Sequence, residues 1–142
     1  MKMKKIKILI FVILVTNILI AQNISFKELD AIKSKSSLEI ETFLKKKDYS
    51  LINKQSNSSQ WQSKDSSSII QFNGKGVLVY LTYNYKAYKA ILVDIKLEYE
   101  YTGKSVKNNV SVDSYVKKKA TIFSSATKDN NSNKTIYSLT FI

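Results

Sequence analysis

The sequence of 142 residues contains no cysteine, histidine, proline or arginine, and it has only three glycines. Without cysteine the chain can form no disulfide. Without histidine or cysteine it can build neither a Ser-His or Cys-His catalytic pair nor a zinc site of the usual His/Cys type. Three glycines are too few for a glycine-rich phosphate loop. We therefore expect no catalytic residues, no cofactor and no metal, and a protein that is not an enzyme.

One enzyme motif does survive these absences. Ser114–Lys117 and Ser125–Lys128 both fit S-x-x-K, the nucleophile motif of penicillin-recognising enzymes. The partner motifs S-D-N and K-T-G are missing. In a chain this rich in serine and lysine such matches arise by chance, so the expectation of a non-enzyme stands.

All basic residues of the chain are lysines. There are 23 lysines against 11 acidic residues, and the formal net charge is +12. Such a charge would suit nucleic acid, an anionic polysaccharide or an anionic membrane surface. The absence of arginine, the better bidentate reader of phosphate, argues against nucleic acid. Abundant Lys, Asn, Ile and Ser are also typical of AT-rich coding sequence, so the lysines have a second explanation as plain surface solvation.

The first 21 residues have the pattern of a secretory signal peptide. Four lysines precede an almost wholly apolar run from Ile8 to Ile20, and Ala21 offers a small residue for cleavage. The alternative is an uncleaved anchor, but a span needs about 20 apolar residues and this run is shorter and contains Asn17. We expect residues 1–21 to be removed, leaving a single domain of residues 22–142 without a membrane span. Loss of the four leader lysines would lower the net charge to +8.

Three helices are predicted in the mature chain. Two capping boxes, Ser25–Glu28 and Ser36–Glu39, place a hydroxyl and a glutamate where each can satisfy a free amide of the first turn. The first of these helices should end near Lys33. The third helix follows from apolar residues that share one helical face: Tyr88, Ile91, Leu92, Ile95 and Tyr99.

The rest of the chain has strand patterns separated by polar turns. Val77–Tyr83 is the strongest, and Asn73-Gly74 before it is a favoured hairpin dipeptide. Gly103 suggests a bulge in the strand that follows the third helix. The predicted fold class is α+β, a two-layer sandwich with one antiparallel sheet and helices on one of its faces. The other strands are expected around Tyr49–Ile52, Trp61, Ile69–Phe72, Tyr99–Val106, Val110–Val116, Ala120–Ser124 and Ile136–Ile142.

The two halves of the chain suggest a duplicated helix-plus-meander unit. Tyr49 corresponds to Tyr101, Trp61 to Tyr115, and Ile70 to Ile122, with loops of different length between them. This order of elements resembles the small exported bacterial domains of the PepSY and β-lactamase-inhibitor-like type. Proteins of that architecture are often inhibitors or binding modules, so the resemblance implies binding and not catalysis.

A two-layer fold leaves one face of its sheet open, and we expect a partner to bind there. In the central strand we assign Val77, Val79 and Leu81 to the core, which sends Leu78, Tyr80 and Thr82 to the open face. The same alternation turns Val112, Ser114 and Val116 inward and Tyr115 outward. The predicted partner-binding residues are Trp61, Tyr80, Tyr115, Lys117 and Lys119. The alternative is that these rings only shield the sheet, or that Trp61 belongs to the core.

The sequence therefore predicts an exported binding module, inhibitor-like or immunity-like, that acts in the periplasm or outside the cell. Its partner would be a protein or an anionic envelope polymer. The alternative function is a structural or anionic-surface-binding protein of the envelope. The sequence does not specify the oligomeric state.

Overall fold

The computed structural model describes residues 24–73 and 76–142, so the predicted signal peptide and the Gly74 of the predicted hairpin lie outside the described residues. The described chain is α+β, with three helices and an eight-stranded antiparallel sheet. The helices are α2 (Phe26–Lys33), α3 (Ser37–Lys46) and α4 (Tyr85–Glu98). The strands are β1 (Tyr49–Gln55), β2 (Ser58–Ser63), β3 (Ser68–Asn73), β4 (Val77–Thr82), β5 (Glu100–Lys107), β6 (Val110–Lys117), β7 (Ala120–Lys128) and β8 (Thr135–Phe141).

Both predicted capping boxes are confirmed. Ser25 Oγ accepts from the amide of Glu28 while the Glu28 carboxylate accepts from the amide of Ser25, and Ser36 and Glu39 repeat the arrangement at α3. The third helix begins at a different device, the side chain of Asn84, which accepts from the amide of Ala87. These caps satisfy amides that the first helical turn leaves free.

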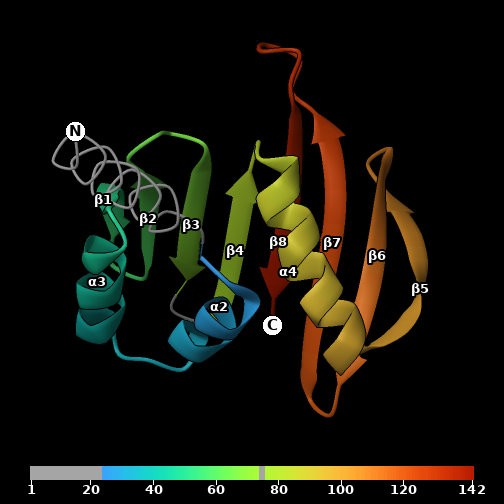
Figure 1. Cartoon of the computed structure of the whole chain (residues 1–142), viewed down its shortest axis with the longest axis horizontal. Helices are drawn as coiled ribbons and strands as arrows, with labels where there is room; N and C mark the ends of the chain where they lie inside the picture. Colours follow the sequence, from blue (N-terminus) through green and yellow to red (C-terminus); the bar gives the residue numbers. More distant parts are fainter. Residues whose placement is uncertain (1–23, 74–75) are drawn as a thin grey trace, which may run out of the picture.

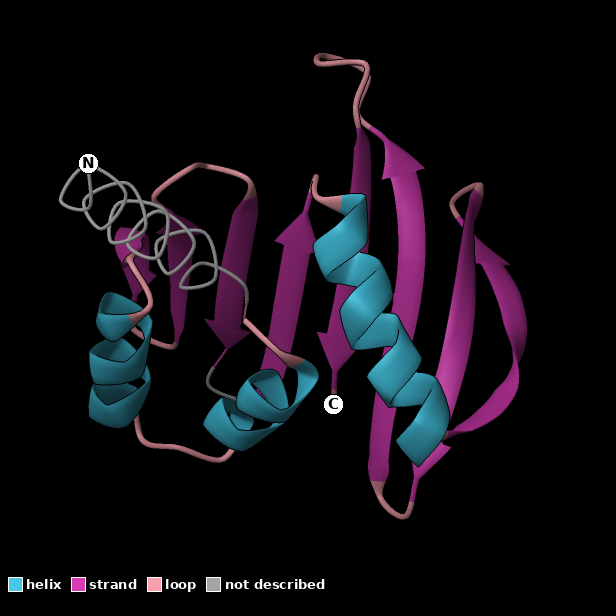
Figure 2. Ribbon diagram, viewed as in Figure 1, coloured by secondary structure: helices cyan, strands magenta, loops and turns pink. Residues whose placement is uncertain are grey.

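The strand order of the sheet is β1-β2-β3-β4-β8-β7-β6-β5. Two meanders, β1 to β4 and β5 to β8, therefore meet where β4 pairs with β8. All three helices lie over the same face of the sheet (Figures 1 and 2). Among the described residues, no helix is both long and apolar enough to cross a membrane.

The core lies between the helices and the covered face of the sheet. Phe26 of α2 joins the two halves, because its ring contacts both Tyr99 (5.9 Å between centroids) and Phe141 of β8 (6.3 Å). Two tyrosine hydroxyls in the core pair with serines: Tyr49 with Ser68 at 2.7 Å, and Tyr88 with Ser124 at 2.6 Å. Among the described residues, no buried side-chain polar atom lacks a hydrogen-bond partner.

The predicted face of the central strand is wrong. Leu78, Tyr80 and Thr82 are buried beneath the helices, whereas Val77, Val79 and Leu81 are only partly buried. The prediction for β6 is wrong in the same way, since Tyr115 is buried and Val112, Ser114 and Val116 are partly exposed. A shift of one residue exchanges the two faces of a strand. Because β4 has apolar residues on both faces, its sequence pattern does not show which face is covered by the helices.

Candidate functional site

The predicted partner-binding residues do not form a surface. Trp61, Tyr80 and Tyr115 are each 2% exposed and belong to the core. The indole nitrogen of Trp61 donates to Ser59 Oγ at 3.1 Å. The prediction that these three rings form an exposed platform is therefore wrong, because large rings gain more from the covered face of the sheet than from the open one.

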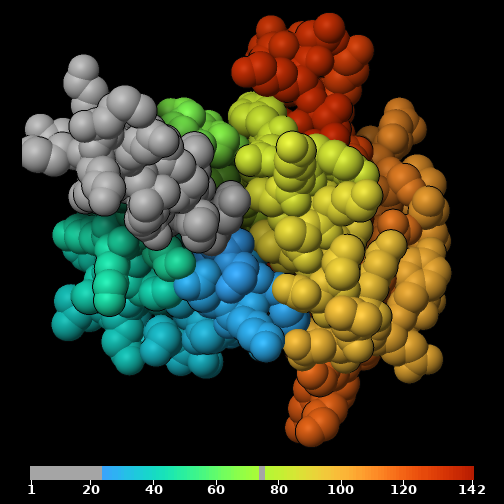
Figure 3. All heavy atoms as spheres, in the orientation of Figure 1, coloured from blue at the N-terminus to red at the C-terminus, as the bar shows by residue number. Residues whose placement is uncertain are grey.

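The two predicted lysines are exposed but lie apart from Trp61. Lys117 Nζ is 2.8 Å from a Glu98 carboxylate oxygen and 5.5 Å from the centroid of the Tyr99 ring. The hydrogen bond to Glu98 raises the pKa of Lys117 above its ordinary value. Lys119 lies in the turn between β6 and β7, which projects from the body of the molecule (Figure 3).

The face of the sheet opposite the helices has a composition of its own. We call two cross-strand rows of this face, which run through β2, β3, β4, β8, β7 and β6, the open face. All twelve residues are partly exposed, and none is charged. The rows are Gln62–Ile69–Leu81–Ser138–Ser125–Val112 and Gln60–Gln71–Val79–Thr140–Phe123–Ser114.

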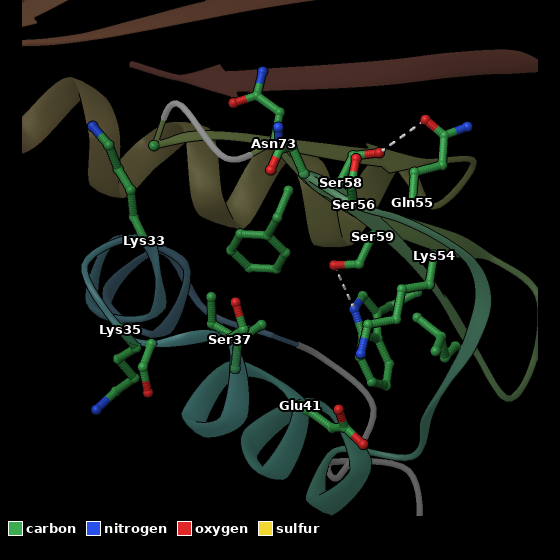
Figure 4. Close-up of a pocket in the computed structure, with 17 residues that line it drawn as sticks. Lys33, Lys35, Ser37, Glu41, Lys54, Gln55, Ser56, Ser58, Ser59 and Asn73 are labelled. Carbon is green, nitrogen blue, oxygen red and sulfur yellow. Dashed lines mark hydrogen bonds between the residues drawn. The ribbon is translucent and has the colours of Figure 1, made fainter.

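Two concave sites lie on the helix side, at opposite ends of the sheet. The first, which we call the α3 pocket, has a volume of about 380 Å³ between α3 and the β1–β2 and β3–β4 hairpins. Ile40, Leu51, Trp61 and Phe72 supply its apolar wall. In Figure 4, Lys54 extends from β1 towards α3 and Glu41, whereas Lys35 points away from the cavity. The basic groups around this pocket therefore do not converge on one point.

The second concave site has a volume of about 500 Å³ beside the C-terminal end of α4, and we call it the tyrosine pocket. Its lining residues come from α4, β5 and β6 and the residue that links α4 to β5: Lys96, Tyr99, Tyr101, Lys104, Asp113 and Tyr115. Of the predicted residues only Tyr115 contributes. Tyr101 pairs with Tyr115 across β5 and β6. The sequence carries a signal for this pairing, because the two residues are the large rings of strands that follow one another in the chain.

The two S-x-x-K matches do not bring a serine and a lysine together. Both S-x-x-K matches fall in strands, β6 and β7, where residues three apart point to opposite faces. The strands therefore separate each serine from its lysine. Within residues 24–73 and 76–142 there is no group of three or more acidic side chains that could hold a metal ion.

The chain was compared with protein-family models, with curated proteins and with solved structures, and none of the three comparisons finds a match.

Proposed function

We propose that this protein is an exported, non-catalytic binding module, inhibitor-like or immunity-like, which docks a protein partner on the open face of its sheet. The observation that carries the proposal is the lack of charge on that face. Lysines and acidic residues are spread over the rest of the chain, yet six strands in succession place only Ile, Val, Leu, Phe, Ser, Thr and Gln on it.

This composition resembles the centre of a protein interface. Interface cores are depleted of charge, and a partner that covers them must strip water from every group beneath it. Val79, Leu81 and Phe123 can be covered at no desolvation cost, and the interspersed hydroxyls and amides can both donate and accept hydrogen bonds. A lysine in the same place would lose its hydration without a compensating bond.

The two rows are large enough to form the centre of an interface. Six strands at a spacing of about 4.8 Å span roughly 24 Å, and the two rows cover roughly 13 Å along the strands. The product, on the order of 300 Å², is less than half of the ~800 Å² that each partner buries in a stable protein complex, so a partner must also cover residues around the two rows.

We further propose that the chain is a two-layer sandwich built from a duplicated helix-plus-meander unit of PepSY or β-lactamase-inhibitor-like type. Its support is the symmetry of the strand order about the β4–β8 pair. Trp61 pairs with Ile70 as Tyr115 pairs with Ile122. Each outer hairpin also has a register shift at the same place, after Leu51 in β1 and after Tyr101 in β5. By this register the counterpart of Tyr101 is Leu51 and not Tyr49.

Export is proposed on the sequence of residues 1–21, and it is tested separately. The exported protein should begin at Gln22, and intact-mass analysis of the protein recovered outside the cytoplasm measures this directly. A mass that retains Met1–Ala21 would contradict removal of the leader.

The docking face is tested by capturing partners from an envelope extract at high salt with matched variants. Leu81→Lys places a charge in the centre of the open face, and Leu97→Lys places the same charge on the outer surface of α4, where Leu97 is 79% exposed. A protein recovered with the wild type and with Leu97→Lys, but not with Leu81→Lys, would support the proposal. Phe123→Gln is a second open-face variant, and circular dichroism verifies that each variant is folded.

Equal recovery of the same protein by all variants would contradict docking on the open face. Binding that disappears at high salt and is insensitive to both open-face variants would instead favour the alternative function, attachment to an anionic envelope polymer through surface lysines. The exposed run Lys117–Lys119, on its projecting turn, is the feature that favours this alternative (Figure 3).

A further inference from the structure

The tyrosine pocket differs from the surroundings of Tyr49 and Tyr88 in its hydroxyl groups. In the core, the hydroxyls of Tyr49 and Tyr88 are paired with serines. By contrast, the hydroxyls of Tyr99, Tyr101 and Tyr115 have no hydrogen-bond partner among residues 24–73 and 76–142. No buried polar atom in that part of the chain is unsatisfied, so these three hydroxyls reach solvent, and all three tyrosines line the same pocket.

The rings provide a flat apolar surface beside these hydroxyls. Tyr101 is 53% exposed, and the centroid of its ring is 5.6 Å from that of Tyr115, which is 2% exposed. The cross-strand pairing of the two residues holds the exposed ring against the buried one. A ring fixed in this way offers an apolar face and a polar edge to a ligand at little cost in side-chain entropy.

The charges around the pocket select the sign of the ligand. Lys96 forms no salt bridge with any described residue, and Lys104 Nζ is 3.8 Å from a carboxylate oxygen of Asp113. Three tyrosines could form a cage for a quaternary ammonium group, but two lysines in the same lining would repel such a cation. The lysines favour an anionic group instead.

Asp113 further restricts the chemical class of the ligand. Its carboxylate accepts hydrogen bonds and donates none, so a ligand made only of acceptors, such as phosphate, would leave it opposed to negative charge. A ligand with both hydroxyl groups and a negative charge satisfies Asp113, the phenols and the lysines together. A volume of about 500 Å³ is within the usual range for small-molecule sites.

We infer that the tyrosine pocket is a binding site for an acidic saccharide, a sugar ring that carries a carboxylate. The ring packs on Tyr101, the carboxylate pairs with Lys96, and the sugar hydroxyls bond to the phenols and to Asp113. The site lies on the helix side of the sheet, so it is separate from the open face, and either can be present without the other. Burial raises the pKa of Tyr99 and of Tyr115 above the ordinary value, and both phenols are protonated donors at neutral pH with or without this shift.

Titration calorimetry of the purified protein with trigalacturonic acid tests the inference. Maltotriose serves as the uncharged saccharide, and hexaglutamate as an acidic chain without sugar rings. We expect saturable binding of trigalacturonic acid that weakens with salt, and little binding of the other two. Tyr101→Ala should weaken binding about tenfold through loss of the ring contact, and Lys96→Gln about fivefold through loss of the ion pair.

Two variants serve as matched controls. Lys86→Gln removes an exposed lysine from the same helix, and Tyr83→Ala removes a tyrosine that is 41% exposed but lies outside the pocket. Both should bind as the wild type does. The inference is overturned if trigalacturonic acid shows no saturable binding, if maltotriose or hexaglutamate binds equally well, or if the pocket variants are indistinguishable from the controls. Because Tyr101 and Lys96 are exposed, unchanged melting temperatures separate loss of binding from loss of fold.

Discussion

The two faces of β4 lead to opposite expectations for adjacent residues. Leu78 is fully buried and pairs across the sheet with Phe72 and Phe141, whereas Val79 lies on the open face. Leu78→Ala removes three buried carbon atoms and leaves a cavity, so the free energy of unfolding should fall by about 2–5 kcal/mol. Val79→Thr keeps the β-branched shape and places a hydroxyl next to water, so the change should stay within about 0.5 kcal/mol.

Urea unfolding followed by the fluorescence of Trp61, the single tryptophan, measures both variants. Trp61 is buried, so its emission should move to longer wavelength as the chain unfolds. The urea concentration at the midpoint of unfolding should differ between the two variants, while the slope of the unfolding free energy against urea concentration stays constant. If the faces were exchanged, the Val79→Thr hydroxyl would be buried without a partner at a cost of about 1–3 kcal/mol. A loss of that size for Val79→Thr, together with a small loss for Leu78→Ala, would refute the assignment of the faces.

Three other predictions concern stability. Ile95→Ala, at a fully buried position of α4, should lower the free energy of unfolding by about 2–5 kcal/mol, and Lys96→Ala should change it by less than about 0.5 kcal/mol; equal effects in denaturant melts would mean that the helical phase is wrong. Deletion of Leu139–Ile142 should abolish soluble folded protein, because it removes two core side chains and three of the five residue pairs between β8 and β4; an unchanged melting temperature would contradict this. Burial opposes the charged form of Glu28, but the Lys47 ammonium at 2.7 Å and the capping bonds outweigh it and hold the pKa of Glu28 below its ordinary value. A lowered folded-state pKa stabilises the fold above the unfolded pKa of about 4.3, and this contribution is lost as the pH falls through the folded value. Glu28→Gln should therefore reduce the loss of stability in acid. The unfolding midpoints of the variant and the wild type, measured between neutral and acid pH, test this. Midpoints that fall in parallel for the two proteins would argue against the contribution of Glu28.

The helices could be predicted well because their signals are local. A capping box is complete within four residues, and both boxes form as their sequences indicate. The apolar stripe of α4 also gave the correct phase, since Tyr88, Ile91 and Ile95 are buried. The bulge suggested by Gly103 is confirmed as a register shift between Tyr101 and Gly103, and the φ of Gly103, 142°, is one that residues with a side chain rarely adopt.

The faces of the strands could not be predicted because they depend on what covers them. β4 has apolar residues on both sides, so alternation alone does not say which set the helices meet. Which face of the strand is covered depends on residues distant in the sequence, such as Phe141, which pairs with Leu78. It also depends on the packing of Tyr80 and Tyr115 in the core beneath the helices. Because the faces of β4 and β6 were exchanged in the prediction, the candidate site was assigned to core residues. The uncharged open face follows only from cross-strand register, and the tyrosine pocket only from the approach of α4 to β5 and β6.

The position of β8 has a consequence for the order of folding. β8 is the last strand in the sequence, yet it lies in the middle of the sheet and pairs with β4 on one side and β7 on the other. Until residues 135–141 have been synthesised, the two meanders have no strand to join them, and β4 and β7 both remain unpaired edges. Such edges can pair with other chains, and contacts between distant parts of the sequence form slowly. The sheet therefore cannot be completed before residues 135–141 are available, and the central β4–β8 and β7–β8 pairings form only when this strand is in place.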